Sequence, residues 1–304
     1  MLHVLTHDIL PVFSMLALGF VLGRLNKVSF DEARAVNRVA FIVLQPALIF
    51  PLIAALSIAE FDFRTMALYA LCQAVLFVVS YLVALHVFKR DHLEAWLLGM
   101  TVIFVNSLLY ILPISILIYG EGGGSLPIKA IVAWDTAFSL FSFAFFIITT
   151  DVMAGGTSAV ASLKRISLNP VLLAIVIGIV VNVANISVPV PLLTAMHFAG
   201  PAAAPLTLFA LGVILSGHSL LPSPTVTAMS ALKLFGFPLA VFAALTAFPA
   251  VTEQWHTLFI LGAAGPSGAM AFSLAMLHGI RTDAIAPVII WTSILSVVSL
   301  AVLA

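Results

Sequence analysis

Residues 255–279 read WHTLFILGAAGPSGAMAFSLAMLHG, an apolar run long enough to cross a lipid bilayer. Gly265-Pro266-Ser267-Gly268 interrupts the run near its middle, where a proline and two glycines are expected to break a helix. Backbone groups freed at membrane depth are tolerated only where protein buries them or where they line a wet cavity. The run therefore predicts a broken membrane helix at a binding site.

A second interrupted run lies in the first half of the chain. Residues 99–120 read GMTVIFVNSLLYILPISILIYG and carry Asn106, Ser107 and Pro113 in their middle. This run has the position in the first half that 255–279 has in the second. Interrupted helices in corresponding halves indicate the substrate site of a secondary transporter.

Composition places the whole chain in a membrane. A mean hydropathy of +1.24, with 63% hydrophobic and 8% charged residues, excludes an ordinary soluble domain. The net charge of zero gives no indication of a nucleic-acid partner, and the start MLHVLTHDIL lacks the basic region of a cleaved signal peptide. We expect an all-α membrane protein with ten spans at 8–23, 36–56, 65–87, 95–119, 128–149, 170–187, 191–216, 226–248, 255–278 and 284–303.

Basic residues predict the orientation of these spans, because short loops rich in lysine and arginine stay in the cytoplasm. Loops after even-numbered spans hold only Arg64 and Lys129. Loops after odd-numbered spans hold most of the others: Arg24, Lys27, Arg34, Arg38, Lys89, Arg90, Lys164, Arg165 and Arg281. We therefore expect a multi-pass inner-membrane protein with both termini outside, in the periplasm, and a cytoplasmic linker at 151–169.

The two halves, 1–150 and 170–304, share residues at one nearly constant spacing. The matching pairs are Pro11 with Pro170, Gly19 with Gly178, Pro46 with Pro205, Phe50 with Phe209, Gly120 with Gly279 and, at almost the same spacing, Trp134 with Trp291. Each half has five spans, so the second copy enters the membrane from the opposite side. The sequence predicts two five-helix inverted repeats, in which broken helices four and nine correspond.

The second halves of the broken helices are expected to begin near Ser107 and Ser267. Each would present unpaired N–H groups and a partial positive charge close to the bilayer midplane. Two such ends attract an anion, most simply a carboxylate. The candidate substrate-binding residues are Asn106, Ser107, Tyr110, Pro113, Gly265, Pro266, Ser267 and Gly268. The alternative is that the prolines only kink packed helices.

Two charges lie inside predicted spans, where charges are costly and often functional. Asp135 and Lys233 could meet near the midplane as an ion pair whose balance changes when H⁺ or Na⁺ binds. Lys233 could instead extend to the cytoplasmic surface. Gln73 is expected to serve as an interhelical hydrogen-bonding residue.

We expect no metal site and no cofactor, since no histidines have metal-site spacing. Gly265-Pro266-Ser267-Gly268 fits a GxSG pattern that resembles the nucleophile motif of rhomboid intramembrane proteases. A nucleophilic serine needs a base within hydrogen-bond reach, and His278 lies about 16 Å further along the same helix. A hydrolase is therefore the weakest of the alternatives.

The order of several motifs resembles the auxin efflux carrier family in its bacterial branch, over essentially the whole chain. These motifs are PVFSMLALGFVLGR, VLQPALIF, NPVLLAIVIGIVVN, APLTLFALGVILSG and LKLFGFP. The resemblance implies transport of small organic acids such as malonate or malate, and a fold like that of the bile-acid sodium symporters. Spans one, two, six and seven would then form a scaffold, and spans three to five and eight to ten a mobile core in which spans four and nine cross.

The expected function is that of a secondary carrier for a small carboxylate, working by alternating access. The alternative carrier is a sodium-coupled symporter of larger amphipathic acids. The apolar faces of spans two and seven further predict a homodimer.

Overall fold

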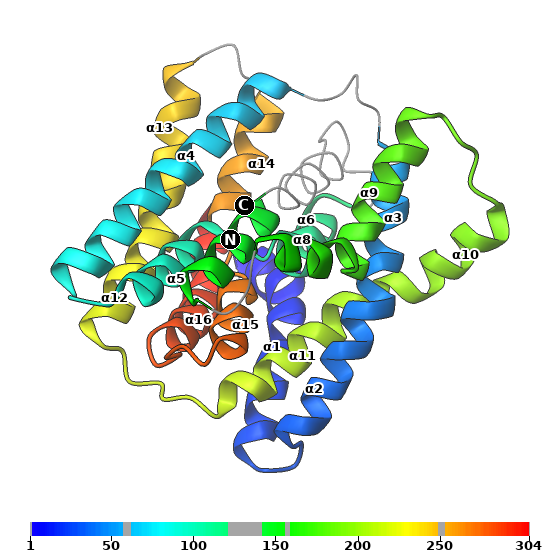
Figure 1. Ribbon diagram of the computed structural model, residues 1–304. Helices are drawn as coiled ribbons and strands as arrows, with labels where there is room; N and C mark the ends of the chain where they lie inside the picture. Colours follow the sequence, from blue (N-terminus) through cyan, green and yellow to red (C-terminus); the bar gives the residue numbers. More distant parts are fainter. Residues whose placement is uncertain (1, 57–61, 121–141, 156–158, 249–252, 304) are drawn as a thin grey trace.

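The computed structural model describes residues 2–56, 62–120, 142–155, 159–248 and 253–303 (Figure 1). The described residues are overwhelmingly helical, which confirms the predicted all-α class. Among the described residues, six helices are long and apolar enough to cross a membrane: Val4–Arg24, Phe30–Ala54, Phe63–Val87, Val190–Ser216, Pro224–Ala247 and Ile285–Leu303 (α16). Asp135 and the first part of the predicted fifth span lie outside the described residues.

Shorter helices account for the other predicted spans. They are α5 (His92–Ile103), Ser107–Tyr119, Ser142–Met153, α9 (Pro170–Val183), α14 (Glu253–Ala263) and α15 (Met270–Leu277). Each of the ten apolar runs thus contains helix where the structure describes it. The two runs with glycine, proline and polar residues in their middle are each divided into two helices, as the sequence indicates.

Several long helices contain a π-helical turn just before a proline. The continuous helices with such a turn are η1 (Val4–Ile9) with α1 (Leu10–Arg24), α2 (Phe30–Val39) with η2 (Ala40–Leu44) and α3 (Gln45–Ala54), η5 (Ser107–Ile111) with α6 (Leu112–Tyr119), and α12 (Pro224–Ala231) with η7 (Leu232–Gly236) and α13 (Phe237–Ala247). A proline has no N–H to donate, and a local π adjustment is one way to accommodate the missing bond without ending the helix. The other composite helices are α4 (Phe63–Leu82) with η4 (Val83–Val87), and α10 (Val190–Ala199) with η6 (Gly200–Ala202) and α11 (Ala203–Ser216).

The helices separate into two groups (Figure 1). On one side lie α4, α5, α12, α13 and α14, and on the other lie α2, α3, α9, α10 and α11. Next to the second group, α1 packs closely along α11: a Cβ added to Gly19 would lie 2.0 Å from the Phe209 carbonyl oxygen. The absence of a side chain at Gly19 therefore sets the distance between these two helices.

The structure adds two local features to the predicted loops: a helix in the linker at 151–169 and a capping box at the start of α2. The predicted loop at 151–169 contains a helix, α8 (Ala159–Ser167), because its alanines, leucine and lysine favour a helix in a stretch that buries Ser162 and Ile166. The helix α2 begins with a capping box, in which the Ser29 hydroxyl accepts from the Glu32 N–H and the Glu32 carboxylate accepts from the Ser29 N–H.

Candidate functional site

The two broken helices cross at their interruptions and satisfy each other's backbone. After α5 ends, Val105 forms a single antiparallel bridge with Ser267. The Asn106 N–H donates to the Pro266 carbonyl at 3.0 Å, and the Gly268 N–H donates to the Phe104 carbonyl at 2.8 Å. Backbone groups freed by the two breaks are therefore paired inside the protein, as membrane depth requires.

Side chains from two other helices support the carbonyl ends of the first half-helices. Gln73 on α4 donates through Nε2 to the carbonyl oxygen of Ile103, the last residue of α5, at 3.4 Å. Lys233 on η7 donates through Nζ to the carbonyl oxygen of Ala263, the last residue of α14, at 2.8 Å. A cation suits a helix C-terminus because the helix dipole is negative there. The expectation that Gln73 is an interhelical hydrogen-bonding residue is confirmed.

Lys233 does not extend to a surface. Its side chain is fully buried, and its ammonium lies 4.8 Å from the ring centroid of Phe237. The sequence interpretation in which Lys233 reaches the cytoplasmic face is therefore wrong, because the helix end at Ala263 lies within reach and binds the ammonium. Its proposed partner Asp135 lies outside the described residues.

The N-terminal ends of the second half-helices face a common cavity. Asn106 is the N-cap of η5, Ala269 is the N-cap of α15, and neither helix end has a side-chain cap. Both residues line one cavity of about 540 Å³. The first N–H groups of a helix have no partner within that helix, and together they carry a partial positive charge. The cavity therefore receives two positive helix ends, which is the arrangement predicted for anion binding.

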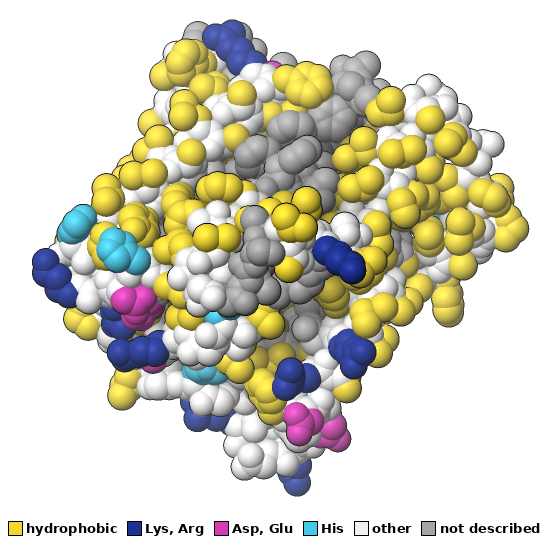
Figure 2. Space-filling model, viewed as in Figure 1, with side chains coloured by type: hydrophobic (Ala, Val, Ile, Leu, Met, Phe, Trp, Pro, Cys, Tyr) yellow, Lys and Arg dark blue, Asp and Glu magenta, His cyan; other side chains and the backbone are white. Residues whose placement is uncertain are grey.

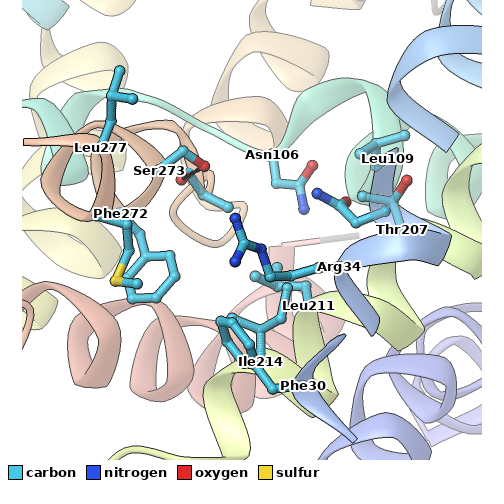
Figure 3. Close-up of a pocket in the computed structure, with 13 residues that line it drawn as sticks. Phe30, Arg34, Asn106, Leu109, Thr207, Leu211, Ile214, Phe272, Ser273 and Leu277 are labelled. Carbon is cyan, nitrogen blue, oxygen red and sulfur yellow. Dashed lines mark hydrogen bonds between the residues drawn. The ribbon is translucent and has the colours of Figure 1, made fainter. Parts of the chain in front are cut away.

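The two groups of helices supply opposite walls of this cavity. The wall from the crossing helices consists of Asn106, Leu109, Ala269, Phe272, Ser273, Met276 and Leu277, and the wall from α2 and α11 consists of Phe30, Arg34, Asn37, Thr207, Leu211 and Ile214. Figure 3 shows the Arg34 side chain extending from α2 toward Asn106 and Ser273. None of these lining residues is acidic, so the charge that they contribute is positive.

Of the eight predicted site residues, Asn106 is the one that lines this cavity. Ser107 and Tyr110 are buried behind it, in the helix that Asn106 begins. Pro113 does not form the break, because it lies in the first turn of α6 after a π-helical turn, beyond the extended residues that interrupt the helix.

The Gly265 to Gly268 segment has a different role from the one expected. The Ser267 N–H donates to the Thr292 hydroxyl at 3.2 Å, and the Gly268 N–H donates to Phe104. These two N–H groups, which were expected to bind the anion, are therefore already used within the protein. Pairing with Val105 holds Ser267 in an extended bridge, so α15 begins at Met270 and not near Ser267.

The crossing also explains the first glycine of this segment. A Cβ added to Gly265 would lie 2.6 Å from Cδ1 of Ile111 and 2.9 Å from Cγ1 of Val105. Gly265 therefore allows the two broken helices to approach each other. At Gly268 the nearest atom to an added Cβ would be the Val105 carbonyl oxygen at 3.5 Å, which is an ordinary contact.

Sequence reasoning missed Arg34, Thr207 and Ser273. The pattern of basic residues places Arg34 in or beside a cytoplasmic loop, although the capping box of Ser29 and Glu32 is a local signal that a helix has already begun there. Nothing in the sequence near Thr207 or Ser273 indicates a cavity, because both depend on how α11 and α15 pack.

The geometry does not support a serine hydrolase. The ring of His278 pairs with Asp151, whose carboxylate lies 2.7 Å from Nε2, and Asp151 also accepts a hydrogen bond from Ser162. The Ser267 hydroxyl has no hydrogen-bond partner among the described residues. Among the same residues, no three His, Cys, Asp or Glu side chains lie close enough together to hold a metal ion.

Comparison with known proteins gives the family. The model of the family described as "Membrane transport protein" matches residues 4–154 and 157–304. A protein of Rhizobium meliloti named "Putative malonate transporter" is 25% identical, with 96% of this chain and 92% of that protein covered.

Two further relatives carry no substrate in their names. An "Uncharacterized transporter" of Methanothermobacter thermautotrophicus is 26% identical over 97% of this chain and 96% of its own. The "Uncharacterized transporter YfdV" of Escherichia coli K12 is 24% identical over 86% of this chain and 84% of its own. The matched family covers nearly the whole chain, which is a multi-pass membrane transporter and not an enzyme. The chain belongs to the membrane transport protein family, the family of the auxin efflux carriers.

Proposed function

We propose that the chain is a secondary carrier of small organic anions such as malonate or malate. The observation that carries the proposal is the cavity of about 540 Å³, which receives two uncapped helix N-termini and an arginine but no acidic lining residue. A carboxylate in this cavity would be stabilised by helix dipoles and by a cation. The name of the Rhizobium meliloti relative favours malonate within this class.

Two pairs of equivalent contacts support an inverted repeat. Gly19 packs against Phe209, and its repeat mate Gly178 packs against the Phe50 carbonyl, which would lie 3.4 Å from an added Cβ. In the same way, Gln73 supports the end of α5 while Lys233 supports the end of α14. Both sets of contacts recur at nearly the spacing found between the two halves of the sequence.

The two groups of helices suit alternating access. The crossing helices would move with α4, α12 and α13 as a transport core, against a scaffold of α1 to α3 and α9 to α11. The cavity lies between these groups, so relative movement would open and close it. Figure 2 shows hydrophobic side chains over much of the surface and most of the visible basic side chains over the lower half of the view. We assign the end of the molecule that carries these basic side chains to the cytoplasm, in an inner-membrane protein with periplasmic termini.

Coupling to H⁺ or Na⁺ stays a prediction that involves Asp135 and Lys233. The buried ammonium of Lys233 at the end of α14 gives a charged group next to the crossing. Protonation or ion binding nearby would change the charge around this helix end, and with it the energy of anion binding.

Counterflow in proteoliposomes tests the proposal. Purified protein is preloaded with malonate, malate, indole acetate or taurocholate, with and without sodium, and uptake of the same labelled acid is followed. We expect counterflow of malonate or malate and its loss in Asn106→Leu, because a larger apolar side chain would replace the N-cap at the cavity wall. Sodium-dependent counterflow of taurocholate alone would favour the bile-acid-like alternative and contradict the proposal.

A further inference from the structure

We propose that Arg34 determines the charge of the acid that is carried, by binding a second anionic group, so that the carrier prefers dicarboxylates to monocarboxylates. This inference rests on the proposed function, because it places the substrate in the same cavity. Arg34 lies on α2, across the cavity from the two helix ends, and its side chain extends toward them (Figure 3).

The guanidinium of Arg34 is available for a ligand. Its Cζ lies over the ring of Phe30, 5.7 Å from the ring centroid. Among the ion pairs of the described residues, none joins Arg34 to the acidic residues beside it, Asp31 and Glu32. Glu32 is held instead by the N–H and hydroxyl of Ser29, at 2.8 and 2.7 Å. The charge of Arg34 is therefore not neutralised by its own helix.

Three other arginines of the described chain bind partners within the protein. Arg90 pairs with Glu94 at 2.8 Å, and Arg281 pairs with Asp283 at 3.1 Å. Arg24 donates to the His218 carbonyl at 2.7 Å. Each of these guanidinium groups binds within the protein, and none of the three residues lines the cavity. Arg34 combines a position on the cavity wall with a guanidinium that has no such partner in the described chain.

The charge of the cavity matches a dianion. Each helix N-terminus contributes roughly half an elementary charge, and an arginine keeps its full charge in proteins. The two helix ends and Arg34 therefore add to about +2, with no acidic side chain among the lining residues to reduce it. A monocarboxylate would neutralise about half of this charge, whereas a dicarboxylate would neutralise it. The planar fork of arginine also fits a carboxylate through two parallel hydrogen bonds.

The test compares acids that differ in charge but little in size. Wild-type protein, Arg34→Gln and Arg34→Lys are reconstituted in liposomes, and uptake is measured at neutral pH for malonate and monomethyl malonate, and for succinate and monomethyl succinate. Arg38→Gln is the matched control, since Arg38 lies one turn further along α2 and does not line the cavity. Gel filtration of each variant checks that it remains folded.

We expect wild type and Arg38→Gln to take up the dicarboxylate in preference to its monoester. Arg34→Gln should reduce dicarboxylate uptake at low concentration by roughly tenfold to a hundredfold, as expected for the loss of a charged hydrogen-bonding partner. Its monoester uptake should stay close to that of wild type. Arg34→Lys should be intermediate, because it keeps the charge and loses the fork.

Three outcomes would decide against parts of the reasoning. If Arg34→Gln leaves the ratio of dicarboxylate to monoester uptake unchanged, the role of Arg34 is refuted, whether both rates fall or neither does. A wild type that takes up monoesters as well as dicarboxylates would also refute it. A wild type that takes up none of these acids would instead refute the proposed function, and the inference with it.

Discussion

The two glycines of the crossing segment should respond differently to alanine, although they are three residues apart. At Gly265 an added Cβ would lie 2.6 and 2.8 Å from Cδ1 and Cγ1 of Ile111, closer than side-chain atoms approach without a shift. At Gly268 the nearest atom would be 3.5 Å away. Neither glycine has a positive φ, so the comparison isolates packing.

The expected magnitudes follow from overpacking and chain entropy. An extra methyl in a close-packed site costs typically about 1–3 kcal/mol. Replacing glycine by alanine without strain stabilises a protein by about 0.4–1 kcal/mol, because the unfolded chain loses freedom. Gly265→Ala should therefore destabilise the protein by up to about 2 kcal/mol, whereas Gly268→Ala should be neutral or slightly stabilising.

Thermal unfolding of the purified protein in detergent, followed by tryptophan fluorescence, measures the difference. A second variant makes the test specific: Ile111→Ala removes the two nearest atoms and leaves only Cγ1 of Val105, at 2.9 Å, among the three nearest, so the cost of Gly265→Ala should become smaller in the Ile111→Ala background. Equal effects of Gly265→Ala and Gly268→Ala, or an undiminished cost of Gly265→Ala in that background, would refute the packing explanation of the crossing.

Three other predictions concern stability and assembly. Gly19→Ala should separate α1 from α11 and lower the unfolding temperature, whereas Gly262→Ala, with its nearest atom at 3.9 Å, should not; the same fluorescence assay compares them. Burial lowers the pKa of His218 from its ordinary value of 6.5, so below pH 6.5 the unfolded chain binds a proton at His218 more readily than the folded protein and the stability should fall. Unfolding temperatures measured across this pH range should fall less in His218→Gln than in wild type. We expect a homodimer through α10, because this helix has no buried residue within one chain. In a background without the native Cys72, Phe198→Cys should therefore cross-link two subunits in native membranes, whereas Asn106→Cys should not.

The surface proposed for dimerisation is the first part of span seven, α10, and not the small residues that follow it in the same span. Small residues at 200–204 predict close packing on span seven, and the structure uses that packing within the chain: a Cβ on Gly200 would lie 3.0 Å from Cα of Leu48 and 3.1 Å from the Ala47 carbonyl oxygen. The neighbouring helix α10 has exposed apolar residues instead, including Phe198 at 90%. Ala47 on α3 therefore packs against span seven within one chain.

Features that depend on local chemistry were predictable from the sequence. Glycine, proline and polar residues in the middle of apolar runs correctly placed both breaks, and the expected start of the second half-helix near Ser107 is confirmed by η5, which begins at Ser107. Features that depend on distant partners were not predictable. The start of α15 at Met270 results from the bridge between Ser267 and Val105, residues that the sequence does not connect. Arg34 likewise enters the cavity only because α2 packs opposite the crossing.

The charges around the crossing suggest how the proposed cycle could release its substrate. The negative helix ends at Ile103 and Ala263 are supported by Gln73 and Lys233, which belong to the proposed core and would move with it. The positive ends face the cavity and would move with the bound anion. Arg34 belongs to the proposed scaffold and would stay behind.

When the core leaves α2, the positive charge around a dianion would therefore fall from about +2 to about +1. A site that binds a dicarboxylate fully in one position would hold it less strongly in the other. Because a ligand shifts a conformational equilibrium only by its differential affinity for the two states, this difference would favour the position in which Arg34 contacts the substrate. Arg34→Gln should therefore make the apparent affinities for malonate on the two sides of the membrane more nearly equal.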